Sequence, residues 1–349
     1  MNNDQLIDQL AAKRSLPLAG YEQLISQRTP ELAEELARMA RAECERVYGD
    51  AVYTRGLIEF TNYCVNDCLY CGIRRSNGEC RRYRLTQEQI LACADKGHDL
   101  GFRTFVLQGG EDPAATDEWL GGVVSDIKRA HPDCAVTLSV GERSYESYRR
   151  LREAGADRYL LRHETASSEH YRMLHPRAMS YDSRMRCLHD LRDLGYTVGV
   201  GFIVGSPYQT PAYLAADLKF IEQFKPEMCG IGPFVAHHAT PFADFAGGTV
   251  ELTCFLLSLI RLIRPNILLP ATTALGTIDG EGREKGILAG ANVVMPNLSP
   301  VEHRADYELY DNKICTGDEA AECAGCLGAR MISIGRYLAV DRGDPKEAA

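Results

Sequence analysis

The stretch RGLIEFTNYCVNDCLYCG, residues 55–72, joins a short apolar run to three closely spaced cysteines. The run itself, residues 55–61, has the composition and length of a buried strand. Cys64, Cys68 and Cys71 follow it with the spacing C-x3-C-x2-C. The stretch therefore predicts a strand that ends near Thr61 and carries a cluster of thiols on the loop after it.

The same succession of a short apolar or β-branched run, a turn and a helix-period segment continues along the chain, which is the pattern of parallel βα units. Eight such runs are found, at residues 55–61, 104–110, 135–140, 158–165, 198–205, 228–234, 267–273 and 291–297. Eight parallel strands close a TIM-type barrel. We therefore predict an α/β fold, a complete (βα)8 TIM barrel, with catalytic residues on the loops at its carboxyl face.

Helical patterns surround the predicted barrel. Residues 1–50 carry helical patterns only, and Thr29 with Pro30 and Gly49 mark the start and the end of one helix. A cysteine-bearing turn and a helix are predicted over 323–338. Helices between the runs are predicted at 86–97, 144–155, 183–195 and 211–224. The expected organisation is an N-terminal helical extension (1–50), a barrel (51–300) and a C-terminal segment (301–349).

Composition argues against several classes of protein. The 349 residues include 39 basic and 48 acidic side chains, for a net charge of −9, and no Lys/Arg-rich block that would follow a phosphate backbone. The longest apolar stretch, residues 254–263, is too short to span a bilayer, and the N-terminus has no signal-peptide pattern. We expect a cytoplasmic protein without nucleic-acid or membrane partners, in which clustered cysteines indicate metal binding or catalysis.

The loop after the first predicted strand is unusual because it carries three close cysteines instead of four. A structural zinc site would need a fourth protein ligand and normally two paired Cys or His knuckles. Three thiolates can hold three irons of a four-iron cubane and leave the fourth iron open to a small molecule. Zinc and a plain thiol cluster remain the alternatives.

The cysteine spacing, with the aromatic Tyr70 before the last cysteine, resembles the signature of the radical S-adenosylmethionine (SAM) superfamily. The resemblance implies that Cys64, Cys68 and Cys71 hold a 4Fe-4S cluster whose open iron chelates the amino and carboxylate groups of SAM. One electron from the cluster would break the sulfonium bond and release a 5'-deoxyadenosyl radical. The resemblance therefore implies an enzyme.

Two glycine motifs support this resemblance. QGGEDP, after the second run, is similar to the Gly-Gly-Glu motif that receives the SAM ammonium, and GFIVG, on the fifth run, is similar to the G-x-I-x-G pattern that lets adenine approach the backbone. Each motif alone would be an ordinary turn. The residues concerned are Gly109, Gly110 and Glu111, and Gly201, Ile203 and Gly205.

Charged residues are predicted inside the barrel on the fourth strand. Because side chains alternate along a strand, Arg158, Leu160, Arg162 and Glu164 share one face, while His163 faces the surrounding helices. Charges in a barrel lumen are costly unless they bind a ligand or pair with one another. The pattern indicates a ligand chamber, and an internal Arg-Glu ladder is the alternative.

Hydroxyl groups extend this polar face. Thr137 and Ser139 share one face of the third predicted strand, and Thr272 and Thr273 end the seventh. A lumen lined by Arg and Thr suits a small anionic ligand held by bidentate arginine forks. The pair His237–His238, after the sixth strand, is more typical of a polar turn than of a ligand site.

Several whole segments resemble the HydE family of FeFe-hydrogenase maturases, in the biotin synthase-like branch of the superfamily. The segments are IEFTNYCVNDCLYCGIRRSN, VLQGGEDP, AGADRYLLRHETA, MCGIGPFVAHHATP, PATTALGT and GANVVMPNLSP. The resemblance implies that SAM is contacted by Glu164, Ser139 and Arg184. It implies a substrate chamber lined by Arg158, Arg162, Thr137, Thr272, Thr273, Met295 and Tyr307. HydE-like sequences can carry Ser where this chain has Gly109, so a hydroxyl contact there is not expected.

A second cysteine trio, Cys315, Cys323 and Cys326, is spaced C-x7-C-x2-C and resembles the auxiliary iron-sulfur site of many HydE proteins. The resemblance implies a 2Fe-2S or a second 4Fe-4S cluster. Zinc is the alternative, because these spacings do not select the metal. Since the site varies within the family, we expect it to be unnecessary for the radical chemistry.

The resemblance also implies a substrate and partners. The adenosyl radical would act at the sulfur of a small iron-bound cysteine carrying carbon monoxide and cyanide, during assembly of the hydrogenase diiron subcluster. HydG would supply this substrate, HydF would accept the product, and an electron donor would reduce the cluster. The rival enzyme is a methylornithine synthase-like mutase or another biotin synthase-like enzyme, and the non-enzymatic rival is a zinc-binding scaffold.

Overall fold

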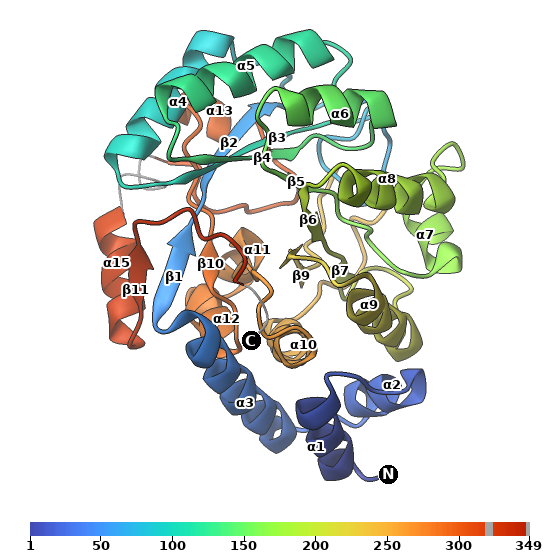
Figure 1. Cartoon of the computed structure of the whole chain (residues 1–349). Helices are drawn as coiled ribbons and strands as arrows, with labels where there is room; N and C mark the ends of the chain where they lie inside the picture. Colours follow the sequence, from blue (N-terminus) through green and yellow to red (C-terminus); the bar gives the residue numbers. More distant parts are fainter. Residues whose placement is uncertain (318–323, 347–349) are drawn as a thin grey trace.

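A computed structural model describes residues 1–317 and 324–346, and its strands stand in a ring with helices around them (Figure 1). Six parallel strands form one sheet in the order β2-β3-β4-β5-β6-β8. Their bounds are β2 Gly56–Thr61, β3 Thr104–Gly109, β4 Ala135–Ser139, β5 Arg158–Leu160, β6 Thr197–Val200 and β8 Met228–Cys229. This sheet accounts for the first six predicted runs.

Single bridges and backbone hydrogen bonds complete the ring. The bridges are Met228–Leu268, Pro270–Val293 and Leu57–Asn297, where Val293 belongs to β10 (Val293–Val294). The Leu298 N–H donates to the Leu57 carbonyl (2.7 Å), and the Leu57 N–H donates to the Pro296 carbonyl (2.9 Å). The pairing therefore passes through all eight predicted positions and returns to the first strand, which confirms the predicted α/β barrel architecture.

Three of the predicted strands are less regular than the sequence suggested. Within the described chain, residues 267–273 contribute bridges instead of a regular strand, because Pro270 has no N–H for the ladder and α11 (Thr273–Ile278) begins at their end. The fifth run breaks between β6 and β7 (Ile203–Val204), and the sixth breaks between β8 and β9 (Gly232–Pro233). β7 pairs with β9, so the two breaks lie side by side.

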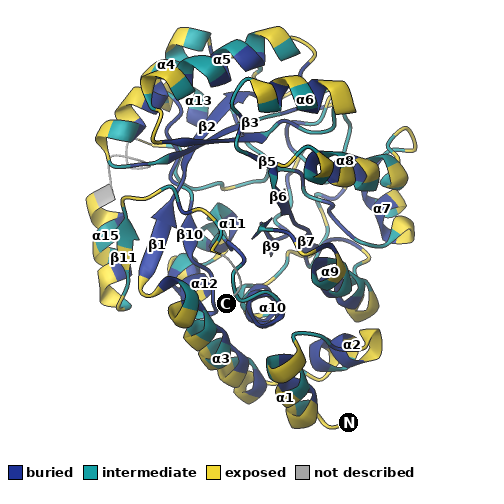
Figure 2. Ribbon diagram, viewed as in Figure 1, coloured by how far each residue is buried: buried dark blue, intermediate teal, exposed yellow. Residues whose placement is uncertain are grey.

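Helices cover the outside of the ring, and most of them bury one face and expose the other, whereas α10 is buried nearly all round (Figure 2). On α5, for example, Leu120, Val123, Val124 and Ile127 are buried at the i, i+3, i+4, i+7 spacing of an amphipathic helix. The covering helices are α4 Gln87–Asp99, α5 Asp117–Ala130, α6 Tyr145–Glu153, α7 Ser168–Leu174, α8 Tyr181–Asp193, α9 Pro211–Phe224, α10 Val250–Ile263, α12 Gly282–Leu288, α13 Val301–Arg304 and α15 Ala324–Ser333. None of the described helices is long and apolar enough to cross a membrane.

Three helices occupy the predicted N-terminal extension: α1 (Asn3–Lys13), α2 (Leu18–Ser26) and α3 (Pro30–Tyr48). The caps of α3 are those expected, since Thr29 Oγ1 accepts the Leu32 N–H (3.2 Å) and Gly49 ends the helix with φ +65°. α3 packs on α10 and α2 packs on α9. The extension thus covers one side of the barrel instead of forming a body of its own.

The predicted helix over 323–338 is wrong at its end. α15 stops at Ser333, because Gly335 has φ +74° and the Arg336 N–H returns to the Met331 carbonyl (2.9 Å). Tyr337–Ala339 then form β11, which lies parallel to β1 (Ala51–Thr54), the continuation of β2 toward its amino end. The C-terminal segment therefore joins the barrel sheet.

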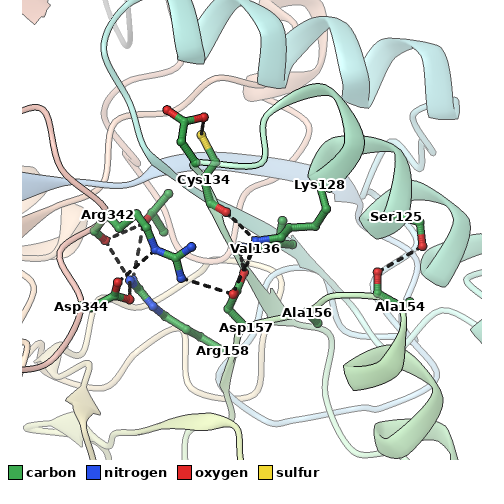
Figure 3. Close-up of polar contacts among 12 residues, drawn as sticks. Ser125, Lys128, Cys134, Val136, Ala154, Ala156, Asp157, Arg158, Arg342 and Asp344 are labelled. Carbon is green, nitrogen blue, oxygen red and sulfur yellow. Dashed lines mark hydrogen bonds and ion pairs between the residues drawn. The ribbon is translucent and has the colours of Figure 1, made fainter.

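The residues after β11 lie at the amino-terminal end of the barrel strands, and Figure 3 shows Arg342 and Asp344 beside Arg158 and Asp157 there. Arg158, fully buried at the start of β5, donates to the Arg342 carbonyl (2.8 Å) and to Asp344 Oδ1 (2.7 Å). Thr104 Oγ1, on β3, donates to the same carbonyl (2.7 Å), and Arg342 pairs with Asp157 (3.2 Å). Because β3 and β5 are not neighbours in the sheet, these contacts lie inside the ring. Residues 341–346 form its floor.

Asp344→Ala should lower the free energy of unfolding by about 1–3 kcal/mol, because the change leaves the buried Arg158 without its carboxylate partner. Chemical denaturation of the two proteins measures the difference. The matched control is Glu251→Ala, which removes only an exposed ion pair with Arg28 and should change stability by less than about 0.5 kcal/mol. Equal losses in the two variants would contradict the role of the floor contact.

Candidate active site

The loop after β2 brings three free, partly buried thiols, Cys64, Cys68 and Cys71, to the carboxyl end of the strands. Asp67 holds the loop in shape, since its carboxylate accepts hydrogen bonds from Arg74 Nε (2.7 Å) and the Ser76 N–H (3.0 Å). The Arg74 guanidinium and the Ser76 donors keep the pKa of Asp67 well below its usual range. The thiols are therefore presented on an ordered loop.

Burial raises the pKa of each of the three thiols. The pKa of Cys71 rises to about 12, first because the thiol is buried and then because Cys64 lies near it. Cys68 is shifted in the same direction by burial and by Cys71. Three neighbouring sulfurs in such a place need positive charge to be thiolates, and soft sulfur donors suit an iron-sulfur cluster. The three thiols thus fit the 4Fe-4S cluster that the sequence implies.

The Gly-Gly-Glu motif packs directly on the cysteine loop. Gly109 ends β3, and a Cβ on Gly110 would collide with a backbone oxygen of the loop and lie 2.7 Å from Cys64 Cβ. The Glu111 carbonyl accepts the Val65 N–H (3.0 Å), while burial raises the pKa of the Glu111 carboxyl group. The motif therefore positions the loop and presents a partly buried carboxyl group beside it.

The glycines of GFIVG are required by packing between strands. A Cβ on Gly201 would collide with the Gly230 carbonyl, and Gly205, with φ +72°, lies against Gly248, whose Cα would be 2.6 Å from such an atom. Protein backbone therefore occupies the space into which a side chain at Gly201 or Gly205 would point. The sequence signal for the Gly201 contact is the glycine-rich run at residues 228–234, which contains Gly230.

Tyr70 and Ile203 meet in one apolar cluster, although 133 positions separate their numbers in the chain. The Tyr70 hydroxyl lies 3.1 Å from His175 Nε2, and His175 Nδ1 lies 3.0 Å from the Tyr171 carbonyl. Burial lowers the pKa of His175 to about 3, so the ring is neutral: Nδ1 donates to the carbonyl and Nε2 accepts from Tyr70. The cluster ties the cysteine loop to the end of α7.

Arg162, Glu164 and Arg184 meet beyond the end of β5. Arg162 Nη2 lies 3.3 Å from Glu164 Oε2, and Arg184, on α8, donates to the Arg162 carbonyl (2.7 Å) and to Glu142 Oε1 (2.7 Å). Glu164 has φ +66°, an uncommon value for a residue other than glycine, and strained backbone of this kind is enriched at functional sites. Ser139, at the end of β4, is partly exposed.

A buried histidine and aspartate stand behind Glu164. His163 faces the helices, as the alternation predicts, and its Nε2 lies 3.3 Å from Asp217 Oδ1 on α9. The Gly201 N–H donates to His163 Nδ1 (3.3 Å), and the Ala166 N–H donates to Asp217 (2.5 Å). The pair links β5, β6 and α9 around Glu164. The sequence analysis did not predict Asp217. The signal that could have found it is an acidic residue among the buried apolar positions of α9.

Unpaired donors line the barrel interior above the floor. Thr137, Arg162 and Thr272 each have a buried side-chain atom without a hydrogen-bond partner among the described residues. Thr137 stands opposite Arg158 in the β4–β5 register and so faces inward with it. Buried unpaired donors are rare in native proteins. A ligand with acceptor groups would satisfy these atoms.

The remaining predicted chamber residues are spread along the interior. Met295 packs against a cluster that includes Met228 and Leu268, and Thr273 begins α11. Tyr307 is buried, with the Lys313 ammonium 4.9 Å from its ring centroid. Arg158 differs from this group, since it lies at the floor with Asp344 instead of near the mouth.

The second cysteine trio is described in part. Cys315 is partly buried and accepts a hydrogen bond from Arg283 Nη2 (3.2 Å), and Cys326 is exposed near the start of α15, whereas Cys323 lies outside the described residues. Lys313, two positions before Cys315, makes a buried ion pair with Glu59 of β2 (2.6 Å). This contact anchors the start of the cysteine segment inside the barrel.

Comparison with known proteins identifies the family. The radical SAM superfamily profile matches residues 58–221. The [FeFe] hydrogenase maturase subunit HydE of Thermotoga maritima is 42% identical over 313 residues, which cover 90% of this chain and 89% of that protein. The chain belongs to the HydE family. It is therefore a SAM-dependent iron-sulfur enzyme of the hydrogenase-maturase type, and a 4Fe-4S cluster and SAM are the cofactors of this superfamily.

Related enzymes share the HydE-family barrel. A 3-methylornithine synthase of Methanosarcina barkeri is 28% identical over 312 residues, 89% of this chain and 88% of that protein. The crystal structure of methylornithine synthase (PylB) has a TM-score of 0.83 at 26% identity and covers 96% of this chain and 97% of that chain. The maturase HydG has a TM-score of 0.81 at 20% identity, over 97% of this chain and 76% of its own, a likeness of fold alone.

Gly110→Ala should lower deoxyadenosine formation by roughly 100-fold, because the added methyl group displaces the Cys64 loop and a shift of about 1 Å at a reacting centre has an effect of that order. Iron content should fall with it. The control is Gly122→Ala on α5, where an added Cβ meets no atom within 4 Å and activity should not change. Normal cleavage and iron content in Gly110→Ala would contradict the packing argument.

Proposed function

We propose that Cys64, Cys68 and Cys71 are the protein ligands of the 4Fe-4S cluster, and that this HydE-family enzyme cleaves SAM reductively at the barrel mouth. One observation carries the proposal: three free thiols lie near Glu111, Glu164 and Arg184 at the mouth of the barrel. Below them the lumen contains buried donor atoms without a hydrogen-bond partner among the described residues. When bound, the cluster would supply the electron that breaks the C–S bond of SAM to give methionine and a 5'-deoxyadenosyl radical. The protein supplies binding, orientation and charge.

The residues around the thiols suit the charges of SAM. The Glu111 carboxyl group, with the backbone of Gly109 and Gly110, would receive the ammonium, and the Arg184 guanidinium would hold the carboxylate. Arg184 is itself oriented by its bonds to Glu142 and to the Arg162 carbonyl. Glu164 and Ser139 would contact the nucleoside. The adenine would lie near Tyr70, Gly201, Ile203 and Gly205.

The lumen suits a small, anionic substrate. The Thr137 and Thr272 hydroxyl groups and Arg162 Nε are buried donors without a hydrogen-bond partner among the described residues, while Arg162 Nη2 pairs with Glu164. We propose that they, with Thr273, Met295 and Tyr307, hold an iron-bound cysteine that carries carbon monoxide and cyanide, so that the radical reaches its sulfur. Arg158 would act at the far end of the lumen, where its guanidinium forms an ion pair with Asp344. The product would serve assembly of the hydrogenase diiron subcluster.

Further parts of the proposal rest on the family. Cys315, Cys323 and Cys326 would hold an auxiliary 2Fe-2S or 4Fe-4S cluster, with Arg283 beside the first thiol. The enzyme would work in the cytoplasm, receive its substrate from HydG, pass its product to HydF and take its electrons from a donor protein. A cell-free hydrogenase activation assay with and without the chain tests this role, and equal activation in both would refute it.

A methylornithine synthase-like mutase is the second candidate, because the PylB structure matches nearly the whole chain with a TM-score of 0.83. The lumen argues for the maturase, since two arginines on one strand suit an anionic substrate better than the lysine that a methylornithine synthase rearranges. Incubation of the reduced enzyme with SAM and lysine separates the two. Methylornithine formation would support the mutase.

Cys64→Ala, Cys68→Ala and Cys71→Ala should each abolish deoxyadenosine formation, because each removes one of only three proposed protein ligands. The matched control is Cys187→Ala, a buried single thiol of α8, which should retain cleavage. The measurement is deoxyadenosine release from SAM after anaerobic reconstitution with iron and sulfide. Full activity in any variant of the trio would refute the ligand assignment.

Cys323→Ala should retain deoxyadenosine formation, because the proposed auxiliary site takes no part in SAM cleavage. Iron content should fall to the level of one 4Fe-4S cluster per chain. Quantitative iron and sulfide analysis, together with the cleavage assay, checks both expectations. A variant without cleavage would show that the second site participates in the radical chemistry.

A further inference from the structure

A second group of metal-binding side chains lies at the barrel mouth, outside both cysteine trios. His237 and His238 follow β9, and Asp311 lies on the segment 305–317 that folds against them. One ligand atom from each residue lies within 4.8 Å of the other two. We propose that His237, His238 and Asp311 bind one divalent transition-metal ion, with Zn²⁺ as the probe, at a site distinct from the iron-sulfur ligands.

His238 is prepared as a ligand by carboxylates on both sides of its ring. Its Nδ1 lies 2.7 Å from Asp311 Oδ1, and its Nε2 lies 3.3 Å from Glu79 Oε2. A carboxylate on the outer nitrogen keeps the proton there and frees the inner nitrogen for a metal, an arrangement found around many metal-bound histidines. The metal would replace the proton that Nδ1 and Asp311 now share. Glu79 is thus a positioning residue.

Asp311 is held so that one oxygen remains for the ion. Its Oδ2 accepts the His238 N–H (2.9 Å), while Oδ1 points to the imidazole Nδ1. The Asp311 N–H donates to the Ala236 carbonyl (3.0 Å), which fixes the backbone as well. The second ligand therefore needs no large movement to bind.

His237 supplies the third donor from a buried position. Its Nε2 lies 3.9 Å from Asp311 Oδ1 and 3.7 Å from Glu308 Oε2, and its ring stacks on that of His238 with centroids 4.4 Å apart. An imidazole binds a metal ion through a ring nitrogen that carries no proton, so Nε2 must be free of its proton in the bound state. Binding through Nε2 moves the proton to Nδ1 and exchanges the Ala239 N–H contact (3.1 Å) for the metal bond.

The surroundings favour a hydrated cation. A hollow of about 260 Å³ borders the two histidines, with room for water ligands. Its lining includes Glu79, Asp306 and Glu308 against one basic side chain, Arg81, which pairs with Asp306 (3.8 Å). Imidazole and carboxylate donors suit borderline metals such as zinc and ferrous iron. One thiol, Cys80, also borders the hollow, whereas the loop of Cys71 presents three.

A bound ion would join three parts of the mouth. Asp311 comes from the segment 305–317, the histidines come from the turn after β9, and Glu79 follows the cysteine loop. The Gly72 N–H already donates to the Leu309 carbonyl (2.9 Å), so the segment rests on the residue after Cys71. The ion would fasten this segment over the cluster loop.

The test is zinc binding to the reconstituted iron-sulfur enzyme, freed of loose metal on a chelating resin. A competing chromophoric chelator measures the dissociation constant, in wild type and in a Cys323→Ala/Cys326→Ala background that disables the auxiliary thiols. One tight zinc ion per chain is expected in both. Zinc X-ray absorption should show only nitrogen and oxygen near about 2.0–2.1 Å, whereas sulfur at about 2.3 Å would overturn the assignment.

Three variants make the test specific. His238→Ala and Asp311→Asn should each weaken zinc binding at least about 100-fold, and Glu79→Gln about 10–100-fold, as for residues that orient a ligand. The control, His98→Ala, alters a separate group of His98, Asp133 and Cys134 and should bind zinc as wild type does. Equal affinity in His238→Ala, Asp311→Asn and wild type would overturn the proposal. Deoxyadenosine formation is measured in parallel, so failure of the proposed function is seen separately.

Discussion

The backbone hydrogen bonds between Leu57 and the segment around Pro296 and Leu298 close the ring, and the mouth of the barrel depends on that closure. They hold the first strand between β3 on one side and the last segment on the other. Because all eight positions then point one way, the loops after them meet at one end. The thiols, Glu111 and Glu164 come from three separate parts of the sequence and are brought together by this ring alone.

Features set by neighbours in the chain could be predicted from the sequence. α9 has the predicted bounds, and the caps of α3 lie at Thr29 and Gly49 as expected. Helix starts, glycine stops and side-chain alternation follow from local backbone chemistry, and so does the inward face of β5. The cysteine loop could be predicted for the same reason, since its three cysteines lie within eight consecutive residues.

Features set by distant partners could not be predicted in this way. β11 is a strand because β1 offers it an unpaired edge, a fact that its own three residues do not carry. Gly201 is fixed by the Gly230 carbonyl, and the reason for the buried Asp217 is His163 on another element. In each case the structural role of a residue can be recognised only when its distant partner is known. The irregular seventh position shows the converse, because Pro270 is visible in the sequence and its missing N–H by itself interrupts the ladder.

The interior of this barrel is more polar than stability alone would favour. Arg55 is buried, its Nη1 contacts Met228 Sδ (2.9 Å), and its Nε and Nη2 find no partner among the described residues. Burial and the nearby Arg158 lower the pKa of Arg55 well below its usual value. Branched apolar side chains normally fill such a lumen. Residues that break a local rule without structural compensation are expected where function requires them.

The floor has a consequence for how the protein is made. Residues 341–346 and β11 follow every barrel strand in the sequence, yet they seal the amino-terminal end through Arg158 and Thr104. During synthesis residues 341–346 emerge after all the barrel strands. The amino-terminal end can therefore be sealed only when nearly the whole chain is available. Until then Arg158 and Thr104 lack the contacts that cover them in the folded protein.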